Sequence, residues 1–152
     1  MRKNSASLYI KTLSFILTLL GFSCSDSTGP VEYGVPSAKF RVKGKVFSTI
    51  NGEKKPLSNI KLKLSKGYDS DSTYSGIDGN FDFALQGFPD NSPIPLTISD
   101  IDGGENHGEF EEQKIDVDFS KATFINGDRH WYEGEATKEL GNIELTLKEE
   151  EN

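Results

Sequence analysis

Lys39-Phe40-Arg41-Val42-Lys43-Gly44-Lys45-Val46 is the stretch that decides the fold, because apolar and basic side chains alternate along it. In an extended chain, successive side chains point to opposite faces, so Phe40, Val42 and Val46 share one face. The basic side chains share the other face. This two-residue period predicts a strand over 40–46 with one buried and one solvated face.

The same alternation recurs down the chain, interrupted by Gly, Pro, Asn and Asp. We expect six further strands: Ile60–Leu64, Thr73–Ile77, Phe81–Leu85, Pro95–Ser99, Ile115–Phe119 and Asn142–Lys148. About seven short strands at this spacing predict an all-β protein, a single Ig-like or transthyretin-like antiparallel β-sandwich.

The intervening segments carry weaker signals. Asn51-Gly52 indicates a turn and Asp78-Gly79 a tight hairpin. We interpret 67–72 as a polar connection and 120–128 as turn-rich, and 135–140 could form a single helical turn. Because opposite charges favour pairing across a sheet, we expect the basic strand to lie beside an acidic one, the strand through 142–147.

An apolar run from Thr12 to Cys24 precedes the predicted domain. Three basic residues, Arg2, Lys3 and Lys11, precede the run, and no acidic residue occurs before Asp26. This layout is typical of a secretory signal, and the run is shorter than the roughly 20 residues of a membrane-spanning helix. We therefore divide the chain into a signal peptide (1–23), a flexible tether (24–37), a β-sandwich domain (38–148) and an acidic tail (149–152).

The end of the signal, Gly21-Phe22-Ser23-Cys24, resembles the lipobox of bacterial lipoproteins, although Gly21 departs from the usual aliphatic residue. The resemblance implies cleavage between Ser23 and Cys24, diacylglycerol on the Cys24 thiol and acylation, typically by palmitate, of the new amino group. Several acyl chains together make a durable anchor. The protein is then expected in the cell envelope, on the periplasmic or surface face of the outer membrane. An ordinary cleaved signal is the alternative.

Charge is divided unevenly along the predicted mature chain. Removal of the signal lowers 17 basic residues to 14 against 24 acidic ones, a formal charge of −10. Residues 24–66 carry +6 and residues 67–152 carry −16. This balance argues against nucleic-acid binding, which requires a basic face. With one cysteine in the sequence, no intramolecular disulfide can form.

Two resemblances cover the predicted domain. Val42–Val46, Lys55–Leu62 and Ile77–Phe83 stand in the order found in carboxypeptidase-regulatory-like, transthyretin-like domains. More narrowly, the chain looks like lipoproteins encoded beside radical SAM enzymes in gut-type bacteria. The segments that carry this resemblance are Gly21–Cys24, Glu32–Pro36, Val42–Gly44, Asp100–Gly103 and Trp131–Gly134.

Few residues of the sequence suggest a catalytic or metal-binding site. His107 and His130 lack a zinc spacing, and no Cys-His or Gly-x-Ser-x-Gly arrangement is present. Asp100, Asp102 and Glu105 form the best metal candidate, because calcium prefers several oxygen ligands on a glycine-containing loop. A solvated acidic loop is the alternative.

Two further features could carry function. Trp131 and Tyr132 would either form a sugar-stacking or partner patch or close one end of the core. Lys43 or Lys45 with Asn142 would suit an internal isopeptide bond, which also requires a buried acid.

These observations predict a non-enzymatic binding or scaffolding module without a cofactor. The narrower resemblance implies that it is associated with a radical SAM system. It would contact the bilayer through acylated Cys24 and bind an unknown protein or glycan. One alternative is a substrate or accessory of the radical SAM enzyme. Another is a calcium-stabilised adhesion or glycan-binding module.

Overall fold

The computed structural model describes residues 34–128 and 130–148, and every regular element in these ranges is a β-strand. The strands are β1 (Ser37–Ile50), β2 (Glu53–Pro56), β3 (Lys61–Lys66), β4 (Asp69–Tyr74), β5 (Asn80–Gly87), β6 (Ile94–Ser99), β7 (Gln113–Val117), β8 (Ile125–Asn126) and β9 (Tyr132–Glu144). The two beyond the predicted seven, β2 and β8, are the shortest. Over the same ranges, we find no helix of the length and apolar character that crossing a membrane requires.

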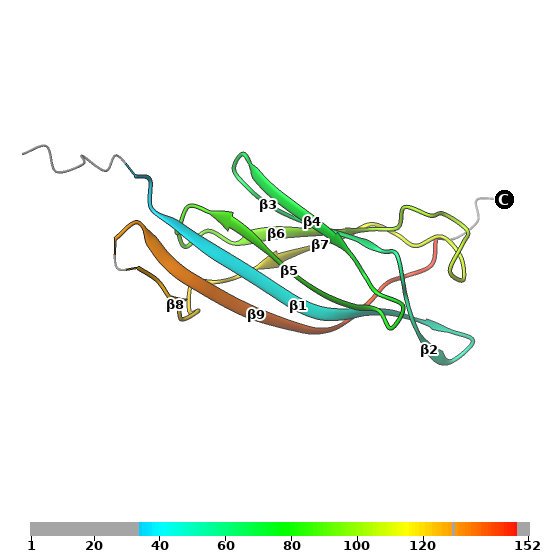
Figure 1. The fold of residues 1–152 in the computed structure, drawn as a ribbon. Coiled ribbons are helices and arrows are strands. Elements are labelled where there is room, and N and C mark those ends of the chain that lie inside the picture. The colour runs from blue at the N-terminus through cyan, green and yellow to red at the C-terminus, as the bar shows by residue number, and fades with distance from the viewer. Residues whose placement is uncertain (1–33, 129, 149–152) are drawn as a thin grey trace, which may run out of the picture. The chain divides into compact units, whose positions relative to one another are not determined.

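The strands form two sheets that stack face to face (Figure 1). One sheet has the order β2-β1-β9-β8, with β5 pairing to β1 as well, and the other has the order β4-β3-β6-β7. All the pairings are antiparallel except that of β1 with β9, which is parallel. The predicted all-β sandwich is confirmed.

The core lies between the sheets and is built by the side chains that alternate inward. Phe40, Val42 and Val46 of β1 are fully buried, as the period predicts. The Phe40 ring meets the rings of Phe119 and Phe124 edge-on, at centroid distances of 5.2 and 5.7 Å. Edge-to-face contacts of this kind add to the stabilisation that burial of apolar area provides.

The predicted neighbour of the basic strand is also confirmed. Lys45 of β1 lies opposite Asn142 of β9, and Val46 lies opposite Ile143. A parallel pairing requires a long crossover, and here nearly the whole domain lies between the two strands. The first and last long strands of the domain therefore lie side by side in its middle (Figure 1).

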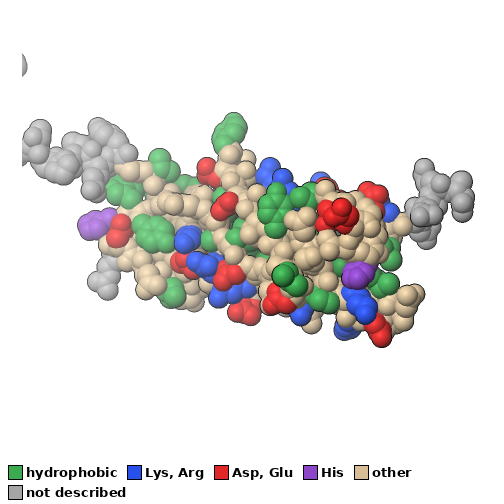
Figure 2. All heavy atoms as spheres, turned by 45° about the vertical axis from the view of Figure 1, so that its right-hand side comes forward, with side chains coloured by type: hydrophobic (Ala, Val, Ile, Leu, Met, Phe, Trp, Pro, Cys, Tyr) green, Lys and Arg blue, Asp and Glu red, His purple; other side chains and the backbone are tan. Residues whose placement is uncertain are grey.

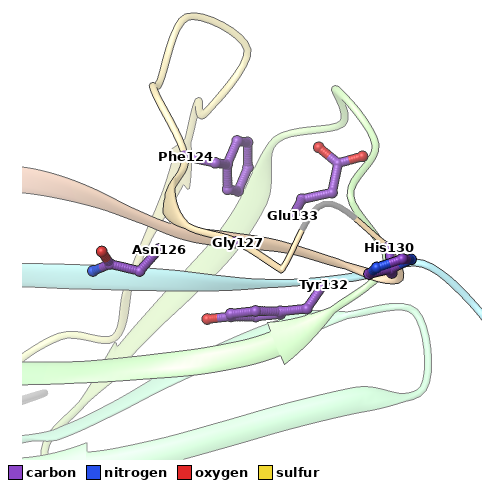
Figure 3. Close-up of a pocket in the computed structure, with 6 residues that line it drawn as sticks. All are labelled: Phe124, Asn126, Gly127, His130, Tyr132 and Glu133. Carbon is purple, nitrogen blue, oxygen red and sulfur yellow. The ribbon is translucent and has the colours of Figure 1, made fainter.

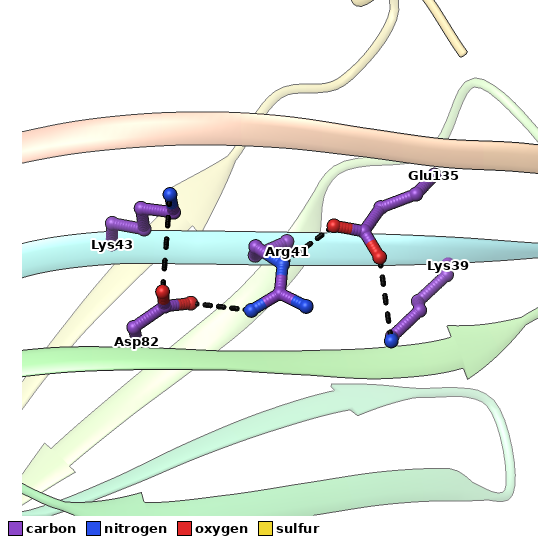
Figure 4. Close-up of polar contacts among 5 residues, drawn as sticks. All are labelled: Lys39, Arg41, Lys43, Asp82 and Glu135. Atoms are coloured by element: carbon purple, nitrogen blue, oxygen red, sulfur yellow. Dashed lines mark hydrogen bonds and ion pairs between the residues drawn. The ribbon is translucent and has the colours of Figure 1, made fainter. Parts of the chain in front are cut away.

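An array of ion pairs covers the outer face of β1 (Figure 4). Arg41 Nε lies 2.5 Å from Glu135 Oε1 of β9, and its Nη1 lies 2.8 Å from Asp82 Oδ1 of β5. Lys39 approaches Glu135 at 3.3 Å and Lys43 approaches Asp82 at 3.8 Å. The array accounts for the basic side chains on the outer face of β1, because this strand lies between two strands that supply acids.

The array also makes stability depend on pH. The hydrogen bond from Arg41 lowers the pKa of Glu135, although partial burial opposes the shift. A carboxylate whose pKa is lower in the folded than in the unfolded state stabilises the fold above its unfolded pKa of about 4.3. That contribution is lost as pH falls through the lowered pKa of Glu135.

Two predicted connections are wrong. Residues 67–72 are not a polar loop, because β4 begins at Asp69 and pairs with β3. β4 lies at the edge of its sheet with mostly exposed side chains. Its sequence therefore lacks the apolar alternation from which a strand is predicted. The turn at Asp78-Gly79 does not close a hairpin. It carries the chain from β4 in one sheet to β5 in the other.

Residues 135–140 do not form the helical turn that the sequence allowed. They belong to β9, a strand of 13 residues that begins at Tyr132. The strand has buried positions at Gly134 and Ala136, followed by exposed residues from Thr137 to Glu139. Pairing with β1 holds this polar segment extended, which its own side-chain pattern does not predict.

Candidate functional site

The loop between β8 and β9 is shaped by an Asn-Gly-Asp sequence. Asn126 adopts a left-handed backbone conformation, with φ of 61°. A Cβ on Gly127 would lie 2.5 Å from the carbonyl oxygen of Glu133, so a residue without a side chain fits there. Asp128 Oδ1 then accepts hydrogen bonds from the backbone N–H groups of His130 at 2.8 Å and Tyr132 at 3.0 Å. These bonds to backbone donors lower the pKa of Asp128.

This loop borders a cavity of about 540 Å³ (Figure 3). Its lining residues are Phe124, Asn126, Gly127, His130, Tyr132 and Glu133. We call this cavity the β8–β9 pocket. The aromatic side chains of Phe124 and Tyr132 are half-buried, which holds their rings in place, whereas Asn126, His130 and Glu133 are exposed.

The chemistry of the β8–β9 pocket suits a ligand with both apolar faces and hydrogen-bonding edges. Aromatic rings provide flat apolar contact at small conformational cost. The Asn126 amide can donate and accept hydrogen bonds, and the Glu133 carboxylate accepts them. Pyranose rings present this combination of a C–H face and hydroxyl edges.

The acidic loop after β6 uses its carboxylates as internal acceptors. Asp100 accepts hydrogen bonds from the backbone N–H groups of Asp102, at 3.1 Å, and Phe110, at 3.0 Å. Asp102 Oδ2 accepts hydrogen bonds from the amides of Asn59, at 3.2 Å, and Asn106. These bonds fasten the loop to the segment before β3.

The two aspartates of this loop titrate differently. Burial raises the pKa of Asp100, and its hydrogen bond with Asp102 raises it further. Burial opposes ionisation of Asp102 as well, but hydrogen bonds from Asp100, Asn59 and Asn106 outweigh it and lower the pKa. Oδ1 of Asp102 is buried and has no hydrogen-bond partner among the described residues.

The predicted calcium ligands are not gathered into one cluster. Asp100 and Asp102 are engaged as described, and Glu105 is exposed. Among residues 34–128 and 130–148, no group of three or more His, Cys, Asp or Glu side chains is placed to hold a metal ion.

The isopeptide candidates are adjacent but lack the acid. Lys45 and Asn142 face each other in the β1–β9 ladder and line a small cavity of about 160 Å³. The other lining residues are Phe47, Lys54 and Pro56, none of them acidic. Asp82 on the neighbouring strand β5 pairs with Arg41 and Lys43.

The remaining predicted residues lie in different places. Ser23 and Cys24 fall outside the described residues. His107 is exposed in the acidic loop. Trp131 is 39% exposed, and its ring packs so closely on Gly34 that a Cβ there would lie 2.8 Å from it. Its carbonyl oxygen accepts a hydrogen bond of 2.7 Å from the N–H of Ser37, so Trp131 joins the start of β1 to the start of β9.

Sequence reasoning identified His130 and Tyr132 but missed the rest of the β8–β9 pocket. Phe124, Asn126 and Glu133 lie in segments with no clear period. The Asn126-Gly127 dipeptide, which is typical of a hairpin turn, was the one local signal that could have indicated a return of the chain here.

Comparison with known proteins does not place the chain in a family. No family model matches it, and no curated protein does. Among solved structures, the chain is similar to a 9R-lipoxygenase from Cyanothece PCC8801, with 18% sequence identity and a TM-score of 0.36. The match covers 68% of this chain and 16% of the lipoxygenase chain, and so weak a likeness carries no inference about activity.

Proposed function

We propose that this protein is a lipid-anchored, non-enzymatic binding module of the bacterial cell envelope, associated with a radical SAM system. The lipobox-like Gly21–Cys24 supports the anchor, and the signal-like sequence ahead of it supports export from the cytoplasm. The observation that carries the binding role is the β8–β9 pocket, where two half-buried aromatic rings lie beside exposed polar groups.

The anchor is tested by replacing Cys24 with alanine. Without the thiol there is no site for the diacylglycerol, so we expect the variant to remain uncleaved or to leave the membrane fraction. Intact mass of the wild-type protein, purified from its native membrane, should equal that of residues 24–152 plus acyl groups. A wild-type chain that retains Met1, or that carries an unmodified Cys24 after export, would contradict the anchor.

The same mass measurement separates the two roles considered beside a radical SAM enzyme. A binding partner of that system keeps the mass of the lipidated chain, whereas a substrate carries an additional shift that lipids do not explain. Comparing protein from a host with and without the radical SAM gene assigns such a shift to that enzyme.

For the pocket, the chemistry favours a saccharide, and Tyr132→Ala is the test. Loss of the ring should weaken binding about tenfold, because burying an apolar ring contributes about 1.5–3 kcal/mol and about 1.4 kcal/mol corresponds to a factor of ten. Binding of the wild-type protein and the variant to an array of bacterial glycans provides the measurement. Tyr74→Ala is the matched control, since Tyr74 is 50% exposed and lies on β4 in the other sheet. Equal glycan binding by all three proteins, or none by wild type, would count against the pocket.

A further inference from the structure

Exposed apolar side chains gather at the end of the domain where the described chain begins. Val35 is 74% exposed, Tyr68 is fully exposed, Phe88 is 50% exposed and Trp131 is 39% exposed. We call these four residues the tether-end patch. Figure 2 shows hydrophobic side chains at the left-hand end of the domain and a further one that projects from its top.

Pairings and cavities place the four residues of the patch together. Ser37 at the start of β1 pairs with Tyr132, next to Trp131, and Ala38 pairs with Gly87, next to Phe88. A cavity of about 400 Å³ lies between three segments of the chain: residues 35–37, the start of β4, and the end of β5 with the residue that follows it. Its lining residues are Val35, Pro36, Ser37, Asp69, Gln86, Gly87 and Phe88. Asp69 is the first residue of β4 and directly follows Tyr68 in the β3–β4 turn. Four separate segments of the chain thus contribute apolar side chains to one end.

The residue types of the patch suit a lipid interface. Single exposed apolar residues are common on soluble surfaces, but a cluster that includes aromatic rings indicates a contact surface. Trp and Tyr have an apolar ring and a polar atom, and they are enriched where a bilayer meets water. Trp131 and Tyr68 provide such rings here.

The length of the preceding sequence keeps this end near the membrane. Gly34, the first described residue, follows Cys24 by ten positions. A chain spans at most about 3.6 Å per residue, so an acylated Cys24 holds the start of the domain within about 36 Å of the bilayer. At so short a range the effective concentration of the surface is about millimolar or higher, and a weak contact is sufficient for docking.

We propose that the tether-end patch docks on the surface of the bilayer that holds the acylated Cys24, with Tyr68, Phe88 and Trp131 in the headgroup region. The inference rests on the proposed lipid anchor. The formal charge of −10 on the mature chain disfavours an anionic surface, so the partner is a zwitterionic lipid. The β8–β9 pocket lies at this same end, and docking would restrict its ligands to molecules present at the membrane surface.

The single tryptophan makes this docking measurable, because Trp131 belongs to the patch. The mature lipidated protein, residues 24–152, is reconstituted into phosphatidylcholine vesicles, with and without bromine on the acyl chains, and floated on a density gradient. Interfacial side chains lie about 5–10 Å into the headgroup and acyl boundary, so we expect the brominated lipid to reduce Trp131 fluorescence about twofold. The Tyr68→Ser/Phe88→Ser variant should float equally but recover most of the fluorescence.

Ile77→Ser/Ile101→Ser is the matched control, because these side chains are 92% and 51% exposed and lie outside the patch. Ile77 lies near Gly79, whose carbonyl accepts a hydrogen bond from Val46 in the far half of β1. This control should be quenched like wild type. Wild-type protein that floats without quenching would overturn the docking and leave the anchor intact. Protein that does not float would overturn the anchor and the docking together, and equal quenching of all three proteins would show that the patch is not the contact.

Discussion

Replacement of Phe40 by alanine should lower the free energy of unfolding by about 3–5 kcal/mol, the usual cost of truncating a buried phenylalanine. The Phe40 side chain is fully buried between the sheets and meets the rings of Phe119 and Phe124. Loss of the ring removes its apolar burial and both edge-to-face contacts, and it leaves a cavity between sheets that close packing prevents from collapsing fully. Urea unfolding followed by far-UV circular dichroism measures the change.

The matched control for Phe40 is Phe88→Ala. Phe88 is 50% exposed, just beyond the end of β5, so its truncation should cost about 1 kcal/mol or less. Similar losses for the two variants would mean that the inward face of β1 is misassigned.

Replacement of Gly79 by alanine should cost about 2–5 kcal/mol, from two sources that add. Gly79 has φ of 76°, where a side chain costs about 1–2 kcal/mol. A Cβ would also overlap the carbonyl oxygen of Val46 and lie 3.3 Å from Pro56 Cβ. Crowding of this kind adds about 1–3 kcal/mol, because the turn cannot move without losing the hydrogen bond from Val46 to the Gly79 carbonyl.

Gly141→Ala separates the two sources. Gly141 has a similar φ of 67°, but no heavy atom lies within 4 Å of the position that a Cβ would occupy. It should therefore show the backbone cost alone, about 1–2 kcal/mol. If the two variants unfold at the same urea concentration, crowding at Gly79 adds nothing to the free-energy cost of the substitution.

The buried faces of the strands could be predicted from sequence because a strand with one buried face has apolar residues at every second position. Phe81, Phe83 and Leu85 alternate with polar residues and are buried, and so are Leu62 and Leu64. This alternation is absent from a strand segment of which neither face is buried. For this reason the sequence predicts a connection over the first part of edge strand β4 and allows a helical turn in the polar half of β9.

The β8–β9 pocket was less predictable than the core. Its lining combines Phe124, which reaches inward toward Phe40, with residues on both sides of the Asn126–Asp128 turn. The sequence marks the turn but not which side chains it brings together, since that depends on how β8 pairs with β9.

By itself, then, the sequence determined the all-β class, the inward positions of most strands and the charge division between the basic first strand and the acidic later ones. The tertiary structure decided the parallel pairing of β1 with β9, the crossing between sheets at Asp78-Gly79, and the gathering of Val35, Tyr68, Phe88 and Trp131 at one end. The physical reason is the range of the contacts. Alternation is set by neighbours two residues apart, whereas pairing and surface clusters depend on residues about a hundred positions apart, which meet only when the whole chain packs.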